Sequence, residues 1–334
     1  MKNSFFLIIG ILFFFSSCTS KKEAVEVSKE ELIIIHLEDS LFQAENVTDL
    51  QQTLSNHLPL AADYFLVDSL NLPIFAKAFY SMTQNEMLKE FYFQSKEERF
   101  FGSNYWEKDL SHLFGRIKTL YPEKKIPIIY TLFTGFGGGG NFSSPALMIN
   151  DEYLAIGLDY YMGEKGKFIA PELYQYQLKR FSPNAMVSQI ALEYAGLFNQ
   201  HEKKNVNLLS DMIWAGKNYY FAKNILPNLM DSTLFGYSSK EIEDSEKFES
   251  TIWEHFVKNS LLYKEDELTK TKYMGDRPKT LEIGPACPGS IGRWLGYRII
   301  DSYMKNHPEI ELKDLMKELN INKLFRESGY QPNK

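Results

Sequence analysis

The side chains that could do chemistry are scattered along this chain. A Gly-rich run at 135–140 invites comparison with a phosphate-binding loop, but no Gly-Lys-Ser or Gly-Lys-Thr follows it. A turn between strands is the better interpretation. His201 begins the run His-Glu-Lys-Lys-Asn, which is similar to the start of a zinc-protease helix. Its fifth residue, Asn205, stands where the second histidine ligand is needed, so we expect a solvated loop there.

No other recognised catalytic or metal-binding pattern is present. The chain has two cysteines, too few for a disulfide framework or a Cys-rich metal site. No Gly-x-Ser-x-Gly elbow occurs. No two histidines have the spacing of metal ligands on one helix; the six are His36, His57, His112, His201, His255 and His307. We therefore expect no cofactor and no enzymatic activity.

Composition limits the class of protein. The chain has 334 residues, of which 44% are hydrophobic and 15% aromatic, enough to bury a core and to exclude global disorder. Its formal net charge is −6, so the excess of basic residues that is typical of nucleic-acid binders is missing. No repeat or Pro/Gly/Ser-rich linker divides it, so one large domain is the simpler expectation.

The N-terminus has the pattern of a lipoprotein signal. Lys2 precedes an apolar run, Phe5 to Phe15, which is too short to span a bilayer as a helix. Ser16 and Ser17 then lead directly to Cys18, as in a bacterial lipobox. Cleavage would leave Cys18 acylated on its sulfur and its amino group, and several acyl chains anchor a protein stably. The alternative is an ordinary signal peptide followed by a chance cysteine.

These features divide the chain into a signal peptide at 1–17, a lipid-anchored polar tether at 18–30 and a single folded domain at 31–334. The membrane is thus one expected partner, through Cys18. The acidic run that often marks surface-exported lipoproteins does not follow this cysteine. We expect a domain that faces the periplasm.

Hydrophobic periodicity predicts an α+β fold that is mostly helical. Residues from about 31 to 120 are expected to be helical. Apolar and aromatic residues recur at mixed spacings of three and four from Leu58 to Phe79 and from Met87 to Phe101, and Pro59 and Pro73 interrupt the pattern, so several short helices are expected. Three β-rich runs follow, at Ile126 to Thr134, Ala146 to Asn150 and Tyr153 to Tyr161, the last two joined by a turn. They predict a small mixed or antiparallel sheet.

Three longer helical patterns follow the predicted sheet, at Pro183 to Phe198, Leu208 to Leu226 and Ser290 to Lys305. The acidic, Ser-rich stretch 238–250 is expected to be a solvated loop or a helix end.

Two of these helices present polar residues that could form a binding pocket. Gln189 and Glu193 lie one turn apart on one helix, as do Arg293 and Tyr297 on the last one. Ser290 could N-cap the last helix and leave its first amide groups open to an anion or a peptide carboxylate. The alternative is an internal polar network that ties the helices together.

The lipobox, the segment Gly157 to Glu164 and the block Gly289 to Tyr297 together resemble the gliding-motility lipoprotein family GldB of Bacteroidota. The resemblance covers most of the mature chain. It implies an envelope lipoprotein required for gliding over surfaces, in cells whose motility apparatus is coupled to type IX secretion. Its expected partners are other proteins of these machineries, and its expected role is non-catalytic binding or scaffolding.

The order of sheet and helices also resembles a wider group of predicted zincin-type metallopeptidases. That resemblance implies a zincin-like core, with His-Glu-x-x-His on one helix and a glutamate ligand on a later helix. Here the first helix, Met186 to Tyr194, has no histidine, and Ala215 stands about where the glutamate would be. The alternative function is a cell-envelope zinc metallopeptidase or another hydrolase, with ligands not recognised in the sequence.

Overall fold

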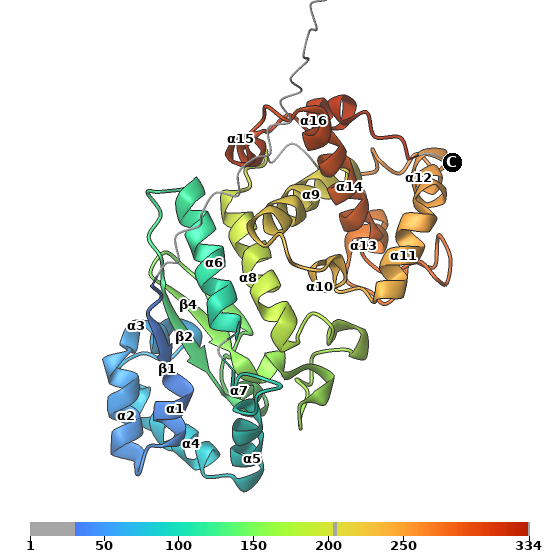
Figure 1. The fold of residues 1–334 in the computed structure, drawn as a ribbon. Helices are drawn as coiled ribbons and strands as arrows, with labels where there is room; N and C mark the ends of the chain where they lie inside the picture. The colour runs from blue at the N-terminus through green and yellow to red at the C-terminus, as the bar shows by residue number, and fades with distance from the viewer. Residues whose placement is uncertain (1–30, 104, 203–205, 333–334) are drawn as a thin grey trace, which may run out of the picture.

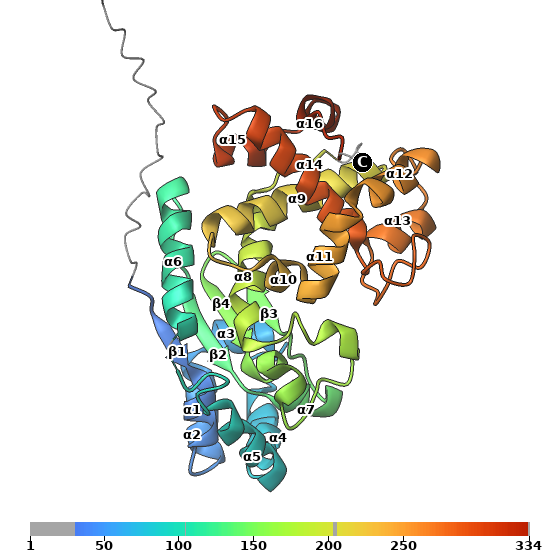
Figure 2. The same cartoon turned by 45° about the vertical axis from the view of Figure 1, so that its right-hand side comes forward.

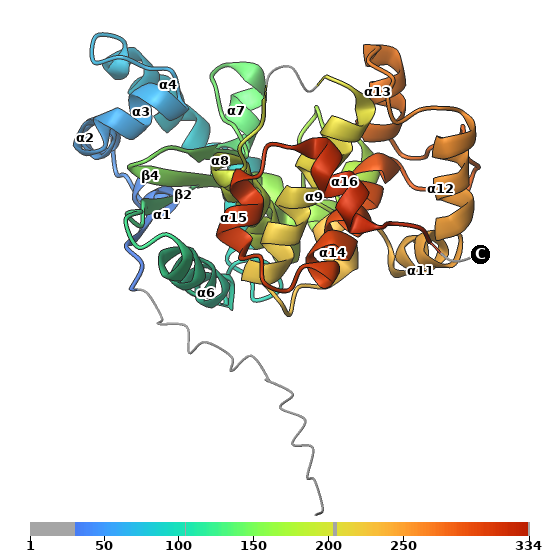
Figure 3. The same cartoon turned by 90° about the horizontal axis from the view of Figure 1, so that it is seen from above.

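The computed structural model describes residues 31–103, 105–202 and 206–332. The predicted signal peptide, the tether and Cys18 lie outside them. A small sheet is covered on one face by N-terminal helices and on the other by helices that continue into a larger helical region (Figure 1). Seen from above, α2–α4 lie at one end of the molecule and α11–α13 at the other (Figure 3). The predicted α+β class is confirmed.

The sheet has four strands in the order β1-β2-β4-β3, and it is mixed. Strands β1 (Ile34–His36), β2 (Ile128–Leu132) and β4 (Tyr153–Gly157) run parallel to one another, and β3 (Leu147–Ile149) forms the antiparallel edge. The predicted β3–β4 hairpin is confirmed. The predicted last strand is too long, because the chain turns into the 3-10 helix η1 (Leu158–Lys165) after Gly157.

Side chains alternate across β2, so the sheet serves two hydrophobic cores. Ile129 packs into the larger core with α6 and α8, whereas Tyr130 and Leu132 pack against the N-terminal helices. This two-sided burial explains why the strand is an almost continuous apolar run.

Short helices fill the N-terminal part, as predicted. They are α1 (Leu37–Phe42), α2 (Val47–Asn56), α3 (Leu58–Tyr64), α4 (Leu72–Thr83), α5 (Glu86–Ser95) and α6 (Tyr105–Leu120). Pro59 and Pro73 begin α3 and α4, because a first-turn proline gives up no helical hydrogen bond. The expectation that residues 31–120 are all helical missed β1.

The Gly-rich run, labelled α7 (Gly135–Gly140), is a left-handed turn between β2 and β3. All six of its residues have positive φ, including Phe136 at φ 57°. The buried carboxylate of Asp159 accepts the backbone N–H groups of Thr134 at 3.2 Å and Phe136 at 2.8 Å. The chain's own carboxylate therefore takes donors that a phosphate would need, and the predicted turn is confirmed.

The C-terminal part is helical. It contains η2 (Gln175–Gln177), α8 (Pro183–Phe198), α9 (Leu208–Ile225), α10 (Asp231–Phe235), α11 (Ser239–Lys247), α12 (Glu249–Lys258), α13 (Glu267–Met274), α14 (Ile291–Asn306), α15 (Leu312–Lys317) and α16 (Ile321–Ser328). The three predicted helices are confirmed as α8, α9 and α14. Stretch 238–250 is not a loop: Ser238 and Glu241 form a capping box that starts α11.

Helices α9 and α14 cross in direct backbone contact. A Cβ atom added to Gly216 would lie 2.2 Å from the carbonyl oxygen of Gly296, and one added to Gly296 would lie 1.8 Å from that of Met212. Only glycine fits at either position. The crossing fixes the place of α14 beside α9, and α8 stands between α9 and the sheet (Figure 2).

Candidate functional site

A cavity of about 600 Å³ lies among the C-terminal helices. Its walls come from α8, the loop after α8, and α9, with single residues from the segment before α8 and from the ends of α13, α14 and α16. We call it the interhelical cavity. Its volume is typical of small-ligand sites. Its polar lining includes Arg180, Gln189, Glu193, Asn199, Asp211 and Arg293.

Three of the five predicted pocket residues meet in this cavity. Gln189 and Glu193 line it from α8, and Arg293 lines it from α14. Ser290 lies instead in a smaller adjoining cavity that shares Arg293 with it. Tyr297 is buried away from both, with its ring 5.4 Å from that of Phe235. Sequence spacing placed Tyr297 one turn from Arg293 but could not show that this turn faces another helix.

The predicted capping role of Ser290 is wrong. Its backbone is left-handed, with φ 55°, and its side chain makes no cap hydrogen bond. The hydroxyl donates to the carbonyl oxygen of Gly275 at 2.8 Å instead. The preceding Pro-Gly pair resembles a helix start, but the turn into α14 needs a conformation that directs this side chain backwards.

The guanidinium of Arg293 makes a single hydrogen bond within the described part of the chain. Its Nε donates to the carbonyl oxygen of Met274 at 2.7 Å. Within the described part of the chain, no carboxylate pairs with it and its terminal N–H groups have no protein partner. The single backbone bond aims the guanidinium without neutralising it. Such a group can receive a carboxylate with two parallel hydrogen bonds.

Glu193 is the opposite charge in the same cavity. Burial raises the pKa of its carboxyl, and no neighbouring group offsets this effect. It makes no hydrogen bond or ion pair among the residues described, so it does not pair with Arg293. A carboxyl group with a raised pKa in a cleft is a common property of functional sites.

Two amide side chains of the cavity each have one buried atom without a hydrogen-bond partner among the described residues. Asn199 is 6% exposed, and its Nδ2 donates to the backbone oxygen of Trp214 at 2.8 Å and to Oδ1 of Asn218 at 2.6 Å. These two bonds fix its orientation and leave its buried Oδ1 without a donor. The buried Nε2 of Gln189 likewise has no acceptor. Unpaired buried polar atoms are rare in folded proteins because each costs about 1–3 kcal/mol.

Lys217 lines the cavity but serves the fold. It is 1% exposed, and its Nζ donates to the carbonyl oxygens of Gln200 at 3.3 Å, Met316 at 3.1 Å and Glu318 at 3.0 Å. Burial lowers the pKa of this ammonium to about 8. The lysine thus ties α9 to the loop after α8 and to the end of α15. Its role was not predicted from the sequence, although it lies one turn after the buried Ile213 on the same face of α9.

The remaining charged groups at the cavity are paired or lie at its rim. Asp211 pairs with Lys270 at 2.9 Å, and Arg180 pairs with Asp276. His201 and Glu202 lie in the loop after α8, as expected, whereas the other three residues of their motif lie outside the described residues.

The described part of the chain contains no group of three His, Cys, Asp or Glu side chains that could hold a metal ion. Helix α8 presents Gln189 and Glu193 to the cavity, and Ala215 lines it from α9. We therefore assign no metal or cofactor ligand. Among the residues described, no helix is both long and apolar enough to cross a bilayer.

Comparison with known families gives a match that covers most of the chain. The sequence model described as gliding motility protein GldB matches residues 19–332. Searches of curated proteins and of solved structures give no match. The zincin-like core therefore stays a prediction.

Proposed function

We propose a specific role for this chain, which belongs to the family of gliding motility protein GldB and so to the lipoproteins of the cell envelope that serve gliding. It acts as a non-catalytic binding component, and the interhelical cavity receives its partner. The observation that carries this proposal is the family match over residues 19–332, because it includes every helix that lines the cavity.

The unpaired groups of the cavity favour binding over an internal network. A structural network pairs its members, as Lys217 does with three carbonyl oxygens. Glu193 and Arg293 have no such counterparts among the described residues, and both are accessible enough to meet a ligand. A ligand that displaced water from the cavity would need to supply a charge partner for each. A bound partner would supply both.

The non-catalytic character rests on the residues that α8 and α9 present. Glu193 would be the only acid on α8 near a substrate, and Ala215 brings no carboxylate from α9. We expect the full chain, purified in detergent, to cleave no peptide from a mixed fluorogenic set. A chelator-sensitive activity that disappears in Glu193→Ala would replace this proposal with the hydrolase alternative.

We propose that lipidated Cys18 attaches the chain to a membrane with the domain in the periplasm, next to other gliding or type IX secretion proteins. Cys18→Ala should remove the acyl chain and release the protein from the membrane fraction. Metabolic labelling with a palmitate analogue, followed by fractionation, measures both. A variant that stays membrane-bound, together with an unlabelled wild type, would contradict the anchor.

The test of the binding role is Arg293→Ala in gliding cells. Removing the open guanidinium should abolish gliding while abundance and melting temperature stay near wild type. Arg326→Ala is the matched control, because that side chain is 79% exposed and lies outside the cavity. A large fall in melting temperature or abundance would show instead that Arg293 is structural.

A further inference from the structure

We infer that the ligand of the interhelical cavity is a short polypeptide segment that carries both a cationic group and a carboxylate. This inference rests on the proposed binding role and names the chemistry of the partner. Four unsatisfied groups of the cavity carry it: the charges of Glu193 and Arg293, and the amides of Gln189 and Asn199.

The two unpaired charges call for a ligand with charges of both signs. Glu193 on α8 and Arg293 on α14 line the same cavity without forming an ion pair with each other. Of the other charges at the cavity, Asp211 pairs with Lys270 and Arg180 pairs with Asp276. The ammonium of Lys217 donates to three backbone carbonyl oxygens, which leaves it no free donor for a ligand. A neutral glycan would leave both charges unmatched. A simple anion would satisfy Arg293 and be repelled by Glu193.

The unpaired amide atoms of Gln189 and Asn199 are complementary to the N–H and carbonyl groups of a peptide bond. Oδ1 of Asn199 is a buried acceptor whose orientation is set by its own two donated bonds, and it has no donor among the described residues, so an N–H of the ligand would satisfy it. The buried Nε2 of Gln189 has no acceptor among these residues, so a carbonyl of the ligand would satisfy it. A peptide backbone supplies both groups at every residue. Pairing with the ligand would relieve the burial cost of both amides.

Size and walls limit the segment to a few residues. The cavity of about 600 Å³ is in the range of small-ligand pockets, so it cannot take a folded domain. Apolar surface for side chains between the charged ends comes from Leu192, Met274, Ile321 and the 39% exposed Trp214. Aromatic surface of this kind is typical of peptide-contacting sites.

Pools of synthetic tetrapeptides test the inference against the full chain in detergent. Two pools are acetylated and amidated at the ends, with Lys and Glu at first and fourth positions in either order. A third has Gln at both positions, and cellotetraose and chitotetraose serve as glycan probes. At millimolar concentration at least one charged pool should raise the melting temperature by about 2–4 °C. The neutral pool and the glycans should not.

The variants then tie the effect to the cavity. Glu193→Gln and Arg293→Gln should each weaken binding of the charged pool at least tenfold, and Glu164→Gln and Arg326→Gln, exposed and outside the cavity, should leave it unchanged. The inference is overturned if no peptide pool binds, if the neutral pool binds equally well, or if a glycan binds instead. Gliding lost in Arg293→Ala with the protein folded would still support the proposed function in any of these cases.

Discussion

Two glutamates of the helical region, Glu241 and Glu193, have opposite surroundings. Glu241 accepts hydrogen bonds from Lys279 at 2.7 Å and Lys179 at 3.1 Å, and from the backbone N–H of Ser238 at 2.8 Å. Burial alone would raise its pKa, but these donors outweigh it and lower the pKa to about 2. Glu193 is more exposed and has no such donors among the described residues, and the desolvation it does undergo raises its pKa.

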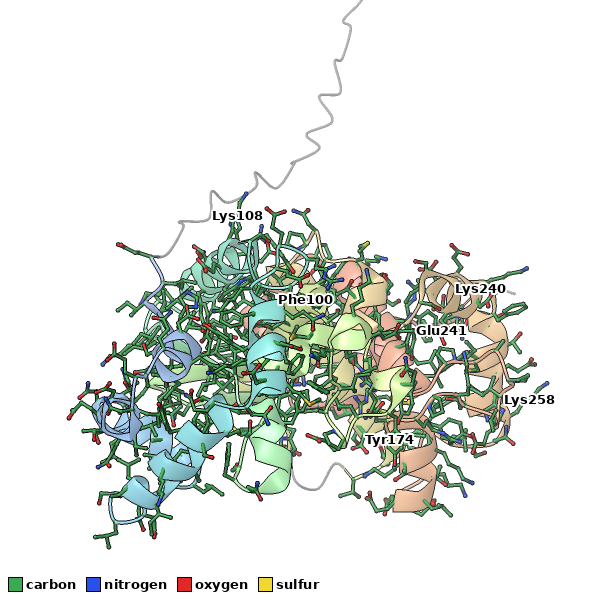
Figure 4. The ribbon with its side chains drawn as sticks, turned by 90° about the horizontal axis from the view of Figure 1, so that it is seen from below. Phe100, Lys108, Tyr174, Lys240, Glu241 and Lys258 are labelled. Carbon is green, nitrogen blue, oxygen red and sulfur yellow. The ribbon has the colours of Figure 1, made fainter. Side chains whose placement is uncertain are left out.

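The difference separates structural charges from available ones. Glu241 lies on the inner side of α11, with its side chain 16% exposed, while its neighbour Lys240 points outward (Figure 4). Its partners come from 62 and 38 residues away along the chain, so the glutamate joins distant segments. Glu193 forms no hydrogen bond or ion pair with any other residue that the structure describes. Where a fold leaves an acid and a base unpaired in one cavity, a ligand is the simplest partner for both.

The largest effect should come from Glu241→Gln. At pH values above 4.5, the pKa of this group in the unfolded state, the carboxylate contributes about 3 kcal/mol to the free energy of unfolding, at roughly 1.4 kcal/mol per pKa unit. The glutamine variant should lose this contribution. In wild type the same contribution should be lost as the pH falls from about 4.5 to about 2. Urea unfolding at pH 7 and pH 3 measures both. Glu243→Gln, exposed on the same helix, is the control; if it loses as much, the cluster is not the cause.

Lys217→Met should reveal the cost of burying an ammonium without a counter-charge. The folded pKa is about 8 against 10.5 for a free lysine, so between these values the unfolded state holds more protons. Wild-type stability should therefore rise relative to the variant by roughly 2–3 kcal/mol from pH 8 to pH 10.5. Guanidinium unfolding across this window measures the difference. Parallel curves for the two proteins would contradict the assignment.

Gln189→Leu should raise the stability of the protein and weaken its function. Replacing an amide whose buried Nε2 has no acceptor with an apolar group of similar size removes a desolvation cost and should add about 1 kcal/mol. Gliding and binding of the charged tetrapeptides should both weaken. Gln175→Leu, at an exposed position, should change neither property. A destabilised Gln189→Leu protein would mean that the amide has a structural partner.

Glu193→Gln should have the smallest effect on stability, less than about 0.5 kcal/mol at pH 7. Since the pKa of Glu193 is raised in the folded state, ionisation at neutral pH already works against folding, and a neutral amide removes that effect. Thermal and urea unfolding beside Glu241→Gln provide the comparison. A loss above 1 kcal/mol would show that Glu193 is structural as well.

Sequence patterns predicted the elements whose signals are local. Helix α8 begins and ends where expected, because Pro183 suits the first turn and an apolar stripe continues to Phe198. Strand β1 was missed because three residues are too few to show alternation. Stretch 238–250 was misjudged because its polar composition hid the capping box of Ser238 and Glu241.

The candidate site was predictable only in part. Spacing placed Gln189 and Glu193 on one face of α8, and both reach the cavity. The orphaned Oδ1 of Asn199 depends on contacts with Trp214 and Asn218, and the role of Lys217 depends on carbonyl groups about one hundred residues away. Such long-range pairings leave no periodic signal in one sequence.

The position of β1 determines how the domain would bear a mechanical load. If Cys18 is the anchor, as proposed, a pull on it would enter the described part of the chain near β1, an edge strand that runs parallel to β2. Tension along the strand loads its backbone bonds together, in shear, rather than opening them one by one. Directly after it, Glu38 is held by Lys96 at 2.9 Å and by Thr131 at 2.6 Å. The load would therefore pass first into the sheet and α5.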